Sequence, residues 1–347
     1  MLLHVTENSP EPMRSQIARQ LRARILTGDL QASSTLPDPR RIARELHVSP
    51  GDVRRALGEL AQEGWLEPAA GASLRVAEVP APRRRAAAQR RLLDDPDGQE
   101  LLRRDLELAR EVQRRLLPPA RVDGEGFTVV SRSFPARVVA GDFHDVLPTA
   151  DAVGVIVADV AGKGLAASLT MASVKAMTPF VAAGRGVAET LRELNRRLAG
   201  ELGRAQFVAL AFARITPCTG IVELANAGMP DPFLVGRRGS VRALEARGPR
   251  LPLGIRPDVP YVSVTTRLAD GERLFLFSDG IPEAPLASGG SFGYDALAAT
   301  VGRGAADGGG VETWLDGVLD RVHDAVGPAL DDDWTAVAVE LRRRGER

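Results

Sequence analysis

The apolar residues of this chain follow two different spacings, one before about residue 80 and one after about residue 150. In the first part they recur three or four positions apart, as Ile17, Leu21 and Ile25 do, which is the spacing of an amphipathic helix. In the second part they form dense runs, such as residues 153–158 and 274–277, which are typical of buried strands. The pattern therefore predicts a helical N-terminal unit followed by a unit built around β-sheet.

The first eighty residues predict a helix-turn-helix followed by a two-stranded wing. Three helices are expected at 13–26, 40–49 and 52–64, and a short turn joins the last two. Residues 65–67 and 73–77 have the composition of two short strands. Helices in this order, followed by a short hairpin, are typical of winged-helix domains.

A change of composition separates the two units. Residues 79–85 and 94–98 contain prolines, which resist continuous helix, so residues 79–98 are expected to be a linker. Beyond them, apolar positions recur at alternating intervals of four and three through 102–116, which predicts a helix over 99–119. This helix either packs on the unit that follows it or serves as a signalling helix between the two units.

Four short Asp-bearing strings, scattered over almost two hundred residues, carry the candidate chemistry. They are 141–143, 159–164, 278–280 and 332–335, and at least three of them directly abut an apolar run. Magnesium and manganese prefer oxygen ligands, and their sites combine a few carboxylates with open positions for water and phosphate. A single Asp after a strand is most often a turn former. Four such strings at strand ends instead predict a site for divalent cations.

Longer strings around these aspartates resemble the ordered motifs of a known family, the bacterial sporulation stage II E and sigma-regulator (SpoIIE/RsbU-type) branch of the type 2C metal-dependent serine/threonine phosphatases. The resemblance runs from about Leu101 to Glu340 and includes the helix that leads into the phosphatase core. It implies an α+β chain whose phosphatase part is an α/β-sandwich of two packed antiparallel sheets flanked by helices. The strings are 135–145, 159–167, 226–228, 278–284 and 332–335.

The resemblance also implies a site for two ions, Mn²⁺ or Mg²⁺, at one edge of the sandwich. Asp142 and Asp159 would hold or bridge the ions, the Val160 carbonyl would add an oxygen, and Asp279 and Asp332 would complete the second side. Two such ions lower the pKa of a bridging water and clamp the phosphoryl oxygens, so no Ser or Cys nucleophile is needed. The implied activity is hydrolysis of phosphoserine or phosphothreonine, and the implied substrate is a phosphorylated anti-sigma factor antagonist.

Three residues depart from the family pattern without removing an expected ligand. Ala140 replaces a glycine, His144 replaces an aromatic residue and Met229 replaces a histidine. His144 is a candidate substrate contact or general acid, and a partly buried polar residue is its simpler interpretation. Lys163, in a Gly-Lys-Gly turn, is a second candidate contact for phosphate, or else a solvated turn lysine. The departures keep open a non-catalytic alternative, a transcription regulator with a degenerate phosphatase-like sensor or docking domain.

The N-terminal segment, about 12–76, resembles the winged-helix domain of the gluconate-repressor (GntR) family. By this resemblance Ser49, Arg54 and Arg55 open the recognition helix and contact DNA. The wing tip, 68–72, lacks the basic residues that this family usually presents to DNA. Sequence-specific binding of operator DNA by a homodimer therefore competes with a second interpretation, a winged helix retained for dimerisation or protein docking.

Composition narrows the class of protein. The 347 residues carry 45 basic and 45 acidic side chains, so no general basic surface for nucleic acid or membranes is expected. No apolar stretch approaches the roughly 18 residues of a membrane span. The single cysteine, Cys218, excludes an internal disulfide and fits a reducing compartment. A cytoplasmic protein without membrane attachment is therefore expected.

These patterns together predict four segments. A winged-helix domain is expected at 1–78, a linker at 79–98, a signalling helix at 99–119 and a phosphatase domain at 120–347. The predicted protein is a metal-dependent phosphoprotein phosphatase coupled to a winged-helix domain that binds DNA or forms the dimer.

Overall fold

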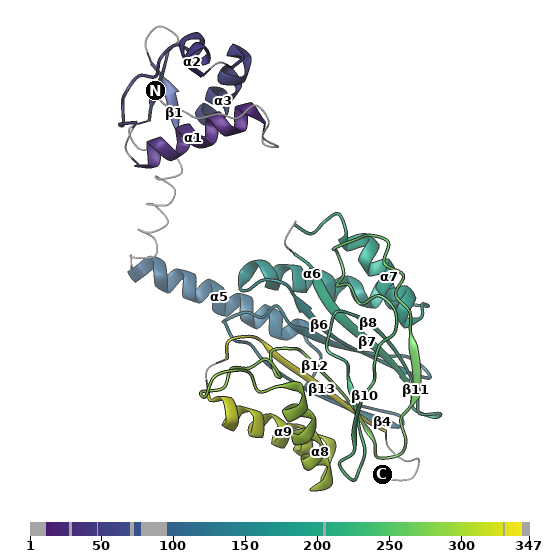
Figure 1. Cartoon of the computed structure of the whole chain (residues 1–347). Helices are drawn as coiled ribbons and strands as arrows, with labels where there is room; N and C mark the ends of the chain where they lie inside the picture. Colours follow the sequence, from purple (N-terminus) through teal and green to yellow (C-terminus); the bar gives the residue numbers. More distant parts are fainter. Residues whose placement is uncertain are drawn as a thin grey trace. The chain divides into compact units, whose positions relative to one another are not determined.

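A computed structural model describes residues 12–27, 30–46, 48–69, 73–77, 96–203, 206–328 and 330–341 (Figure 1). The chain divides into two compact units, Met1–Arg104 and Asp105–Arg347. The boundary falls inside helix α5 (Pro96–Leu116), which starts and ends three residues before the helix predicted at 99–119. The predicted linker, 79–98, lies mostly outside the described residues, so the division into four segments stays a prediction.

The N-terminal unit has the three helices and the two-stranded hairpin that the helix-turn-helix pattern predicts. The elements are α1 (Met13–Thr27), α2 (Pro39–Leu46), α3 (Pro50–Gln62), β1 (Leu66–Pro68) and β2 (Leu74–Val76). The two strands pair antiparallel, with Leu66 opposite Val76. Ile17 and Leu21 of α1 and Leu60 of α3 are completely buried, because the helical spacing places them on the faces that meet in the core.

The C-terminal unit contains two antiparallel sheets. The strands of the first are β3 (Arg121–Gly124), β4 (Phe127–Phe134), β9 (Phe233–Val235), β10 (Val241–Ala243), β12 (Arg273–Phe277) and β13 (Trp334–Leu341), and those of the second are β5 (Phe143–Pro148), β6 (Val153–Val160), β7 (Val208–Thr216), β8 (Ile221–Ala227) and β11 (Val264–Arg267). The six-stranded sheet has the order β10-β9-β12-β13-β4-β3, and the five-stranded sheet has the order β11-β8-β7-β6-β5.

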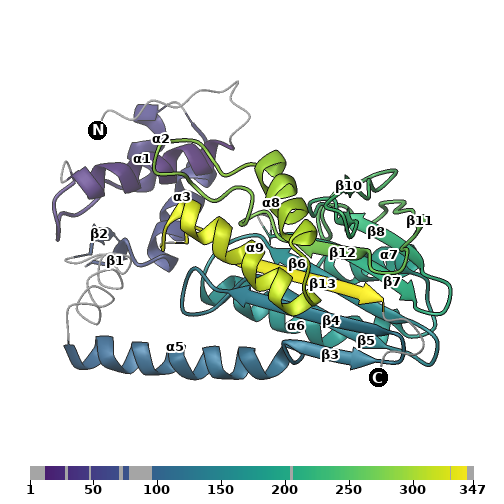
Figure 2. The ribbon, with the colours of Figure 1, turned by 90° about the horizontal axis from the view of Figure 1, so that it is seen from below.

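The two sheets pack face to face, and helices cover both outer faces (Figures 1 and 2). The covering helices are α6 (Leu165–Ala182) and α7 (Val187–Leu198) on the five-stranded sheet and α8 (Tyr294–Ala306) and α9 (Val311–Val326) on the six-stranded sheet. On β6, Val155 and Val157 belong to the core between the sheets. Ile156 and Ala158 point the other way and pack under α6 and α7. The predicted α+β architecture is confirmed.

The expectation that no apolar stretch approaches membrane-spanning length is wrong for α6. By length and composition alone this helix is long and apolar enough to cross a bilayer, although 39% of it is buried inside the domain. Met171 and Val174 are completely buried against the sheet, whereas Leu169 and Phe180 are 62% and 82% exposed. A core helix of a folded domain passes the same test of length and composition, and α6 is one layer of the sandwich.

Candidate metal centre

The four predicted aspartates lie at one edge of the sandwich, two from each sheet. Asp142 immediately precedes β5 and Asp159 is the last residue but one of β6. The β5–β6 register, continued by one pair, places these two aspartates opposite each other. From the other sheet, Asp279 follows β12 and Asp332 precedes β13. The structure thus brings together side chains that are almost two hundred residues apart in the sequence.

Strand periodicity turns these side chains toward the gap between the sheets. Asp159 is in phase with Val155 and Val157, which belong to the core between the sheets. Asp142 is in phase with Val146 of the same core. The carboxylates of the five-stranded sheet therefore face the strand ends of the six-stranded sheet.

Burial and mutual repulsion raise the pKa values of Asp142, Asp159 and Asp279. Burial, and then the Asp159 charge, hold the pKa of Asp142 well above its ordinary value. For Asp159, burial and then the charges of Asp279 and Asp332 raise the pKa to about 7. Burial followed by the Asp332 charge also raises the pKa of Asp279. A bound cation would supply positive charge that stabilises these ionised forms.

The oxygen atoms of the site fit hard divalent cations. Oδ2 of Asp142 is buried and has no hydrogen-bond partner, so this acceptor is available to an ion. A Cβ at Gly141 would come within 3.0 Å of the Val160 carbonyl oxygen, so a glycine lets the loop before Asp142 approach β6. Among the described residues no three His, Cys, Asp or Glu side chains already stand at the spacing of ligands to one ion.

Asp333 supports the site in a way that the sequence did not indicate. Its Oδ1 accepts the backbone N–H of Ala136 at 2.8 Å, and its Oδ2 accepts the N–H of Gly141 at 2.7 Å. The backbone of the next strand is fixed in a similar way, since the Thr335 N–H donates to Ser278 Oγ at 2.9 Å. Asp333 thus ties the segment before β13 to the loop that carries Asp142. The Asp-Asp doublet was the only signal of this role in the sequence.

Helix α5 holds the same loop from the other side. The buried Gln113 amide donates to the Ala140 carbonyl at 2.8 Å and accepts the Ala140 N–H at 2.9 Å. Gln113 is 8% exposed, whereas Leu108 and Val112 are 61% and 59% exposed. Gln113 is therefore the residue that connects α5 to the aspartate loop.

The two candidate substrate contacts differ in their surroundings. His144 is buried and neither ring nitrogen has a hydrogen-bond partner. Burial, and then the nearby Lys175 charge, lower its pKa to about 4, so the ring is neutral at physiological pH. Lys163 instead reaches the site itself, with its Nζ 3.1 Å from Asp332 Oδ2 and 2.7 Å from the Asp331 carbonyl oxygen. A contact of either side chain with substrate stays a prediction.

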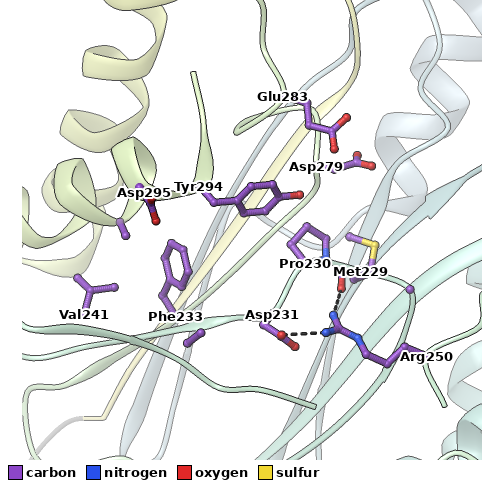
Figure 3. Close-up of a pocket in the computed structure, with 13 residues that line it drawn as sticks. Met229, Pro230, Asp231, Phe233, Val241, Arg250, Asp279, Glu283, Tyr294 and Asp295 are labelled. Atoms are coloured by element: carbon purple, nitrogen blue, oxygen red, sulfur yellow. Dashed lines mark hydrogen bonds and ion pairs between the residues drawn. The ribbon is translucent and has the colours of Figure 1, made fainter. Parts of the chain in front are cut away.

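A cavity of about 660 Å³ opens beside Asp279 (Figure 3). Arg250 pairs with Asp231 at 2.8 Å and donates to the Met229 carbonyl at 2.6 Å, which fixes one wall. The Met229 side chain is 2% exposed and belongs to the core between the sheets. The lining residues are Gly228, Met229, Pro230, Asp231, Phe233, Val241, Ala243, Arg250, Asp279, Glu283, Tyr294, Asp295 and Ala298.

The candidate DNA contacts lie at the start of α3. Ser49 uses its hydroxyl to cap this helix and accepts from Gly51 and Asp52. Arg55 pairs with Asp52 at 2.8 Å, and Arg54 Nε donates to the Pro50 carbonyl at 3.3 Å. Both arginines are exposed on the helix. Their use in binding DNA stays a prediction.

Comparisons with known proteins identify the class of this domain and then its family. The fold is that of PP2C domains, since the chain superposes on the SiaA PP2C domain of Pseudomonas aeruginosa with a TM-score of 0.61, at 20% identity over 70% of this chain and 98% of that one. The model of the family described as stage II sporulation protein E (SpoIIE) matches residues 149–342, more than half of the chain. The chain belongs to this family.

Two curated relatives match separate parts of the chain. Phosphoserine phosphatase RsbU of Bacillus subtilis is 28% identical over 193 residues, which are 55% of this chain and 57% of RsbU. The chain thus spans little more than half the length of that relative. At the N-terminus the gntR regulatory-protein family model matches residues 13–76, which form a GntR domain. There the transcriptional repressor NagR of B. subtilis is 38% identical over 64 residues, 18% of this chain and 26% of NagR.

The raised pKa of Asp159 predicts how stability depends on pH and metal. Its folded value of about 7 lies above its ordinary 3.8, so between these values the folded state binds more protons than the unfolded state. Stability should therefore fall as pH rises through this window. In EDTA we expect the melting temperature to drop by about 5 °C or more between pH 5 and pH 8, and Mn²⁺ to reverse the drop. Scanning calorimetry measures both effects.

Asp159→Asn is the matched control for this prediction. The variant lacks the titrating carboxyl, so its melting temperature in EDTA should change less with pH than that of the unmodified protein. An equal pH dependence in the two proteins would contradict the assignment of the effect to Asp159.

Gln113→Ala should destabilise the C-terminal unit by about 1–3 kcal/mol, because the buried Ala140 N–H and carbonyl lose their partners. Mn²⁺ should also bind more weakly, since the loop before Asp142 is less well held. Urea unfolding and calorimetric titration measure the two effects. Arg114→Ala, at an exposed position one residue on, should change stability by no more than about 0.5 kcal/mol. Equal effects of the two changes would contradict the specific role of Gln113.

Proposed function

We propose that the C-terminal domain is a metal-dependent phosphoprotein phosphatase that hydrolyses phosphoserine or phosphothreonine. The observation that carries the proposal is the convergence of Asp142, Asp159, Asp279 and Asp332 at one edge of the sandwich. The raised pKa values of the first three show that positive charge would stabilise their ionised forms. Membership of the SpoIIE family and the likeness to a curated phosphoserine phosphatase support it. Residues 149–342 of the family match include three of these four aspartates.

In this proposal two Mn²⁺ or Mg²⁺ ions are held by the four aspartates and the Val160 carbonyl. Bound ions of this kind supply a water of lowered pKa and neutralise the phosphoryl oxygens. The chain supplies the geometry. Asp333 fixes the loop before Asp142 through two backbone N–H groups, and Gln113 fixes the same loop from α5. Because the carboxylates come from both sheets, the packing of the sandwich sets their separation.

No side chain of the protein is required as a nucleophile. Cys218 is exposed and follows the end of β7 that is remote from Asp159, because Asp159 pairs with Ala209 near the start of that strand. The cavity beside Asp279 supplies space for the residues that flank the phosphorylated side chain (Figure 3). Its volume of about 660 Å³ lies within the usual range for ligand sites.

The proposed substrate is a phosphorylated anti-sigma factor antagonist, and the protein is proposed to be a cytoplasmic homodimer. The likeness to RsbU, over little more than half of its length, supports a regulatory phosphoprotein. The GntR domain would then couple the phosphatase either to operator DNA or to dimer formation. Two exposed arginines at the start of α3, Arg54 and Arg55, favour the DNA-binding role.

Hydrolysis of p-nitrophenyl phosphate tests the enzymatic proposal. We expect turnover that requires Mn²⁺ or Mg²⁺ and that falls by about a hundredfold or more in Asp279→Asn. The variant loses a ligand to an ion that neutralises negative charge in the transition state. Asp324→Asn, an exposed carboxylate on α9, should retain full turnover. Metal-independent turnover, or none in the unmodified protein, would overturn the proposal and favour a non-catalytic sensor.

The DNA-binding role predicts a specific change in salt dependence. With genomic fragments enriched by the intact protein, Arg54→Ala/Arg55→Ala should weaken binding and reduce the slope of log K against log salt by about 2, if each arginine neutralises one phosphate. Fluorescence anisotropy at several salt concentrations measures this slope. Arg110→Ala/Arg114→Ala on α5 removes the same charge elsewhere. Unchanged binding by the α3 variant would favour a dimerisation or docking module.

A further inference from the structure

Lys163 is one of only two lysines in the chain, and its ammonium contacts a candidate metal ligand. Nζ lies 3.1 Å from Asp332 Oδ2 and 2.7 Å from the Asp331 carbonyl oxygen. The residue is carried by a turn in which Gly162 and Gly164 have φ values of 109° and 79°, a conformation that glycine adopts readily. The turn after β6 thereby reaches the segment before β13.

This contact is distinctive among the ion pairs of the described residues. Only the pair of Lys163 includes one of the four candidate ligands, whereas the other lysine, Lys175, pairs with Asp145 at 2.6 Å behind the site. The Lys163 ammonium therefore partly neutralises the aspartate cluster. Its side chain and that of Asp332 are 45% and 56% exposed, so the pair is solvated and readily broken.

We propose that Lys163 is a built-in counter-cation that holds Asp332 in the metal-free protein and is released from this carboxylate when Asp332 becomes a metal ligand. The inference rests on the proposed function, because it takes Asp332 as a ligand. In this proposal Lys163 positions Asp332. A solvated lysine in the same turn would not have this role.

The geometry of Asp332 explains why the two states exclude each other. Oδ1 already accepts the N–H of Asp333 at 3.0 Å, and Oδ2 is the atom that faces Lys163. An ion bound through Oδ2 needs this oxygen and repels the ammonium beside it. A bound divalent ion would therefore displace the Lys163 ammonium from Asp332.

The released ammonium would remain at the rim of the site. Lys163, Asp279, Glu283 and Asp332 line one cavity of about 170 Å³. A lysine on a flexible four-carbon stem can turn its three N–H donors from the carboxylate to a phosphate oxygen. One side chain would then stabilise Asp332 before metal binds and contact the anionic substrate afterwards.

Amine labelling with mass spectrometry tests the exchange in the full-length, unmodified chain. Lys163 reacts less with an acylating reagent specific for amines while it is paired with Asp332, so in EDTA it should react more slowly than with Mn²⁺. Saturating Mn²⁺ should increase its rate severalfold, whereas Lys175, which is buried in its own ion pair, serves as the internal reference. Asp332→Asn should give the fast rate without metal. Equal Lys163 rates with and without Mn²⁺ would overturn the inference.

Calorimetric Mn²⁺ titration provides an independent readout. Lys163→Met removes the competing ammonium and should tighten Mn²⁺ binding by roughly two- to fivefold. This ratio corresponds to the usual stabilisation by an exposed ion pair. Lys163→Arg keeps the charge and should stay close to the unmodified affinity. Arg137→Met is the matched control, because its guanidinium lies near Gly164 without an ion pair to Asp332. An equal gain in Arg137→Met would indicate a general charge effect and overturn the specific exchange.

Two further outcomes separate the inference from the proposed function. If the Lys163→Met gain persists in an Asp332→Asn background, the competition does not take place at Asp332 and the counter-cation role is overturned while the metal centre stands. If the unmodified protein binds no Mn²⁺ at all, the proposed metal centre fails and the counter-cation role fails with it.

Discussion

The arrangement of this domain is constrained by one interaction, the repulsion between the aspartate carboxylates. Two different sheets hold these carboxylates close to one another. Asp142 and Asp159 come from the five-stranded sheet, and Asp279 and Asp332 from the six-stranded one. Burial and neighbouring charges raise the pKa values of Asp142 and Asp279, and they raise that of Asp159 to about 7. Such an arrangement persists only because the apolar core between the sheets stabilises their packing more than the charges oppose it.

Hydrogen bonds from two side chains to the backbone keep the loop before Asp142 in place. Asp333 accepts the N–H groups of Ala136 and Gly141, and Gln113 binds both polar backbone groups of Ala140. These bonds connect two segments that are far apart in the sequence to one loop. A shift of α5 along its axis would strain the Gln113 contacts first, so the position of this helix and the geometry of the Asp142 loop are physically linked.

Much of the fold and the identity of the site could be predicted, because both leave local traces in the sequence. Dense apolar runs mark the strands, and Asp strings at their ends mark the edge where the sheets meet. The partner of Lys163 could not be predicted, since its ammonium meets residues about 170 positions away in the sequence. Only the packing of the two sheets brings the end of β6 near the start of β13. The backbone role of Asp333 was missed for the same reason. The apolar character of residues 165–182 was underestimated, because Ser, Thr and Lys residues interrupt this segment.

Three residues, Ala140, His144 and Met229, depart from the family pattern. None of them changes the four candidate carboxylates. At Ala140 the backbone, and not the side chain, makes the contacts with Gln113. At Met229 the side chain is buried in the core, and its N–H donates to Asn226 at 2.9 Å, a bond that any residue other than proline could make. His144 is neutral and buried and therefore adds no charge to the cluster. The oxygen atoms that a divalent ion requires are the same with these residues as without them, which favours an active metal centre over a degenerate one.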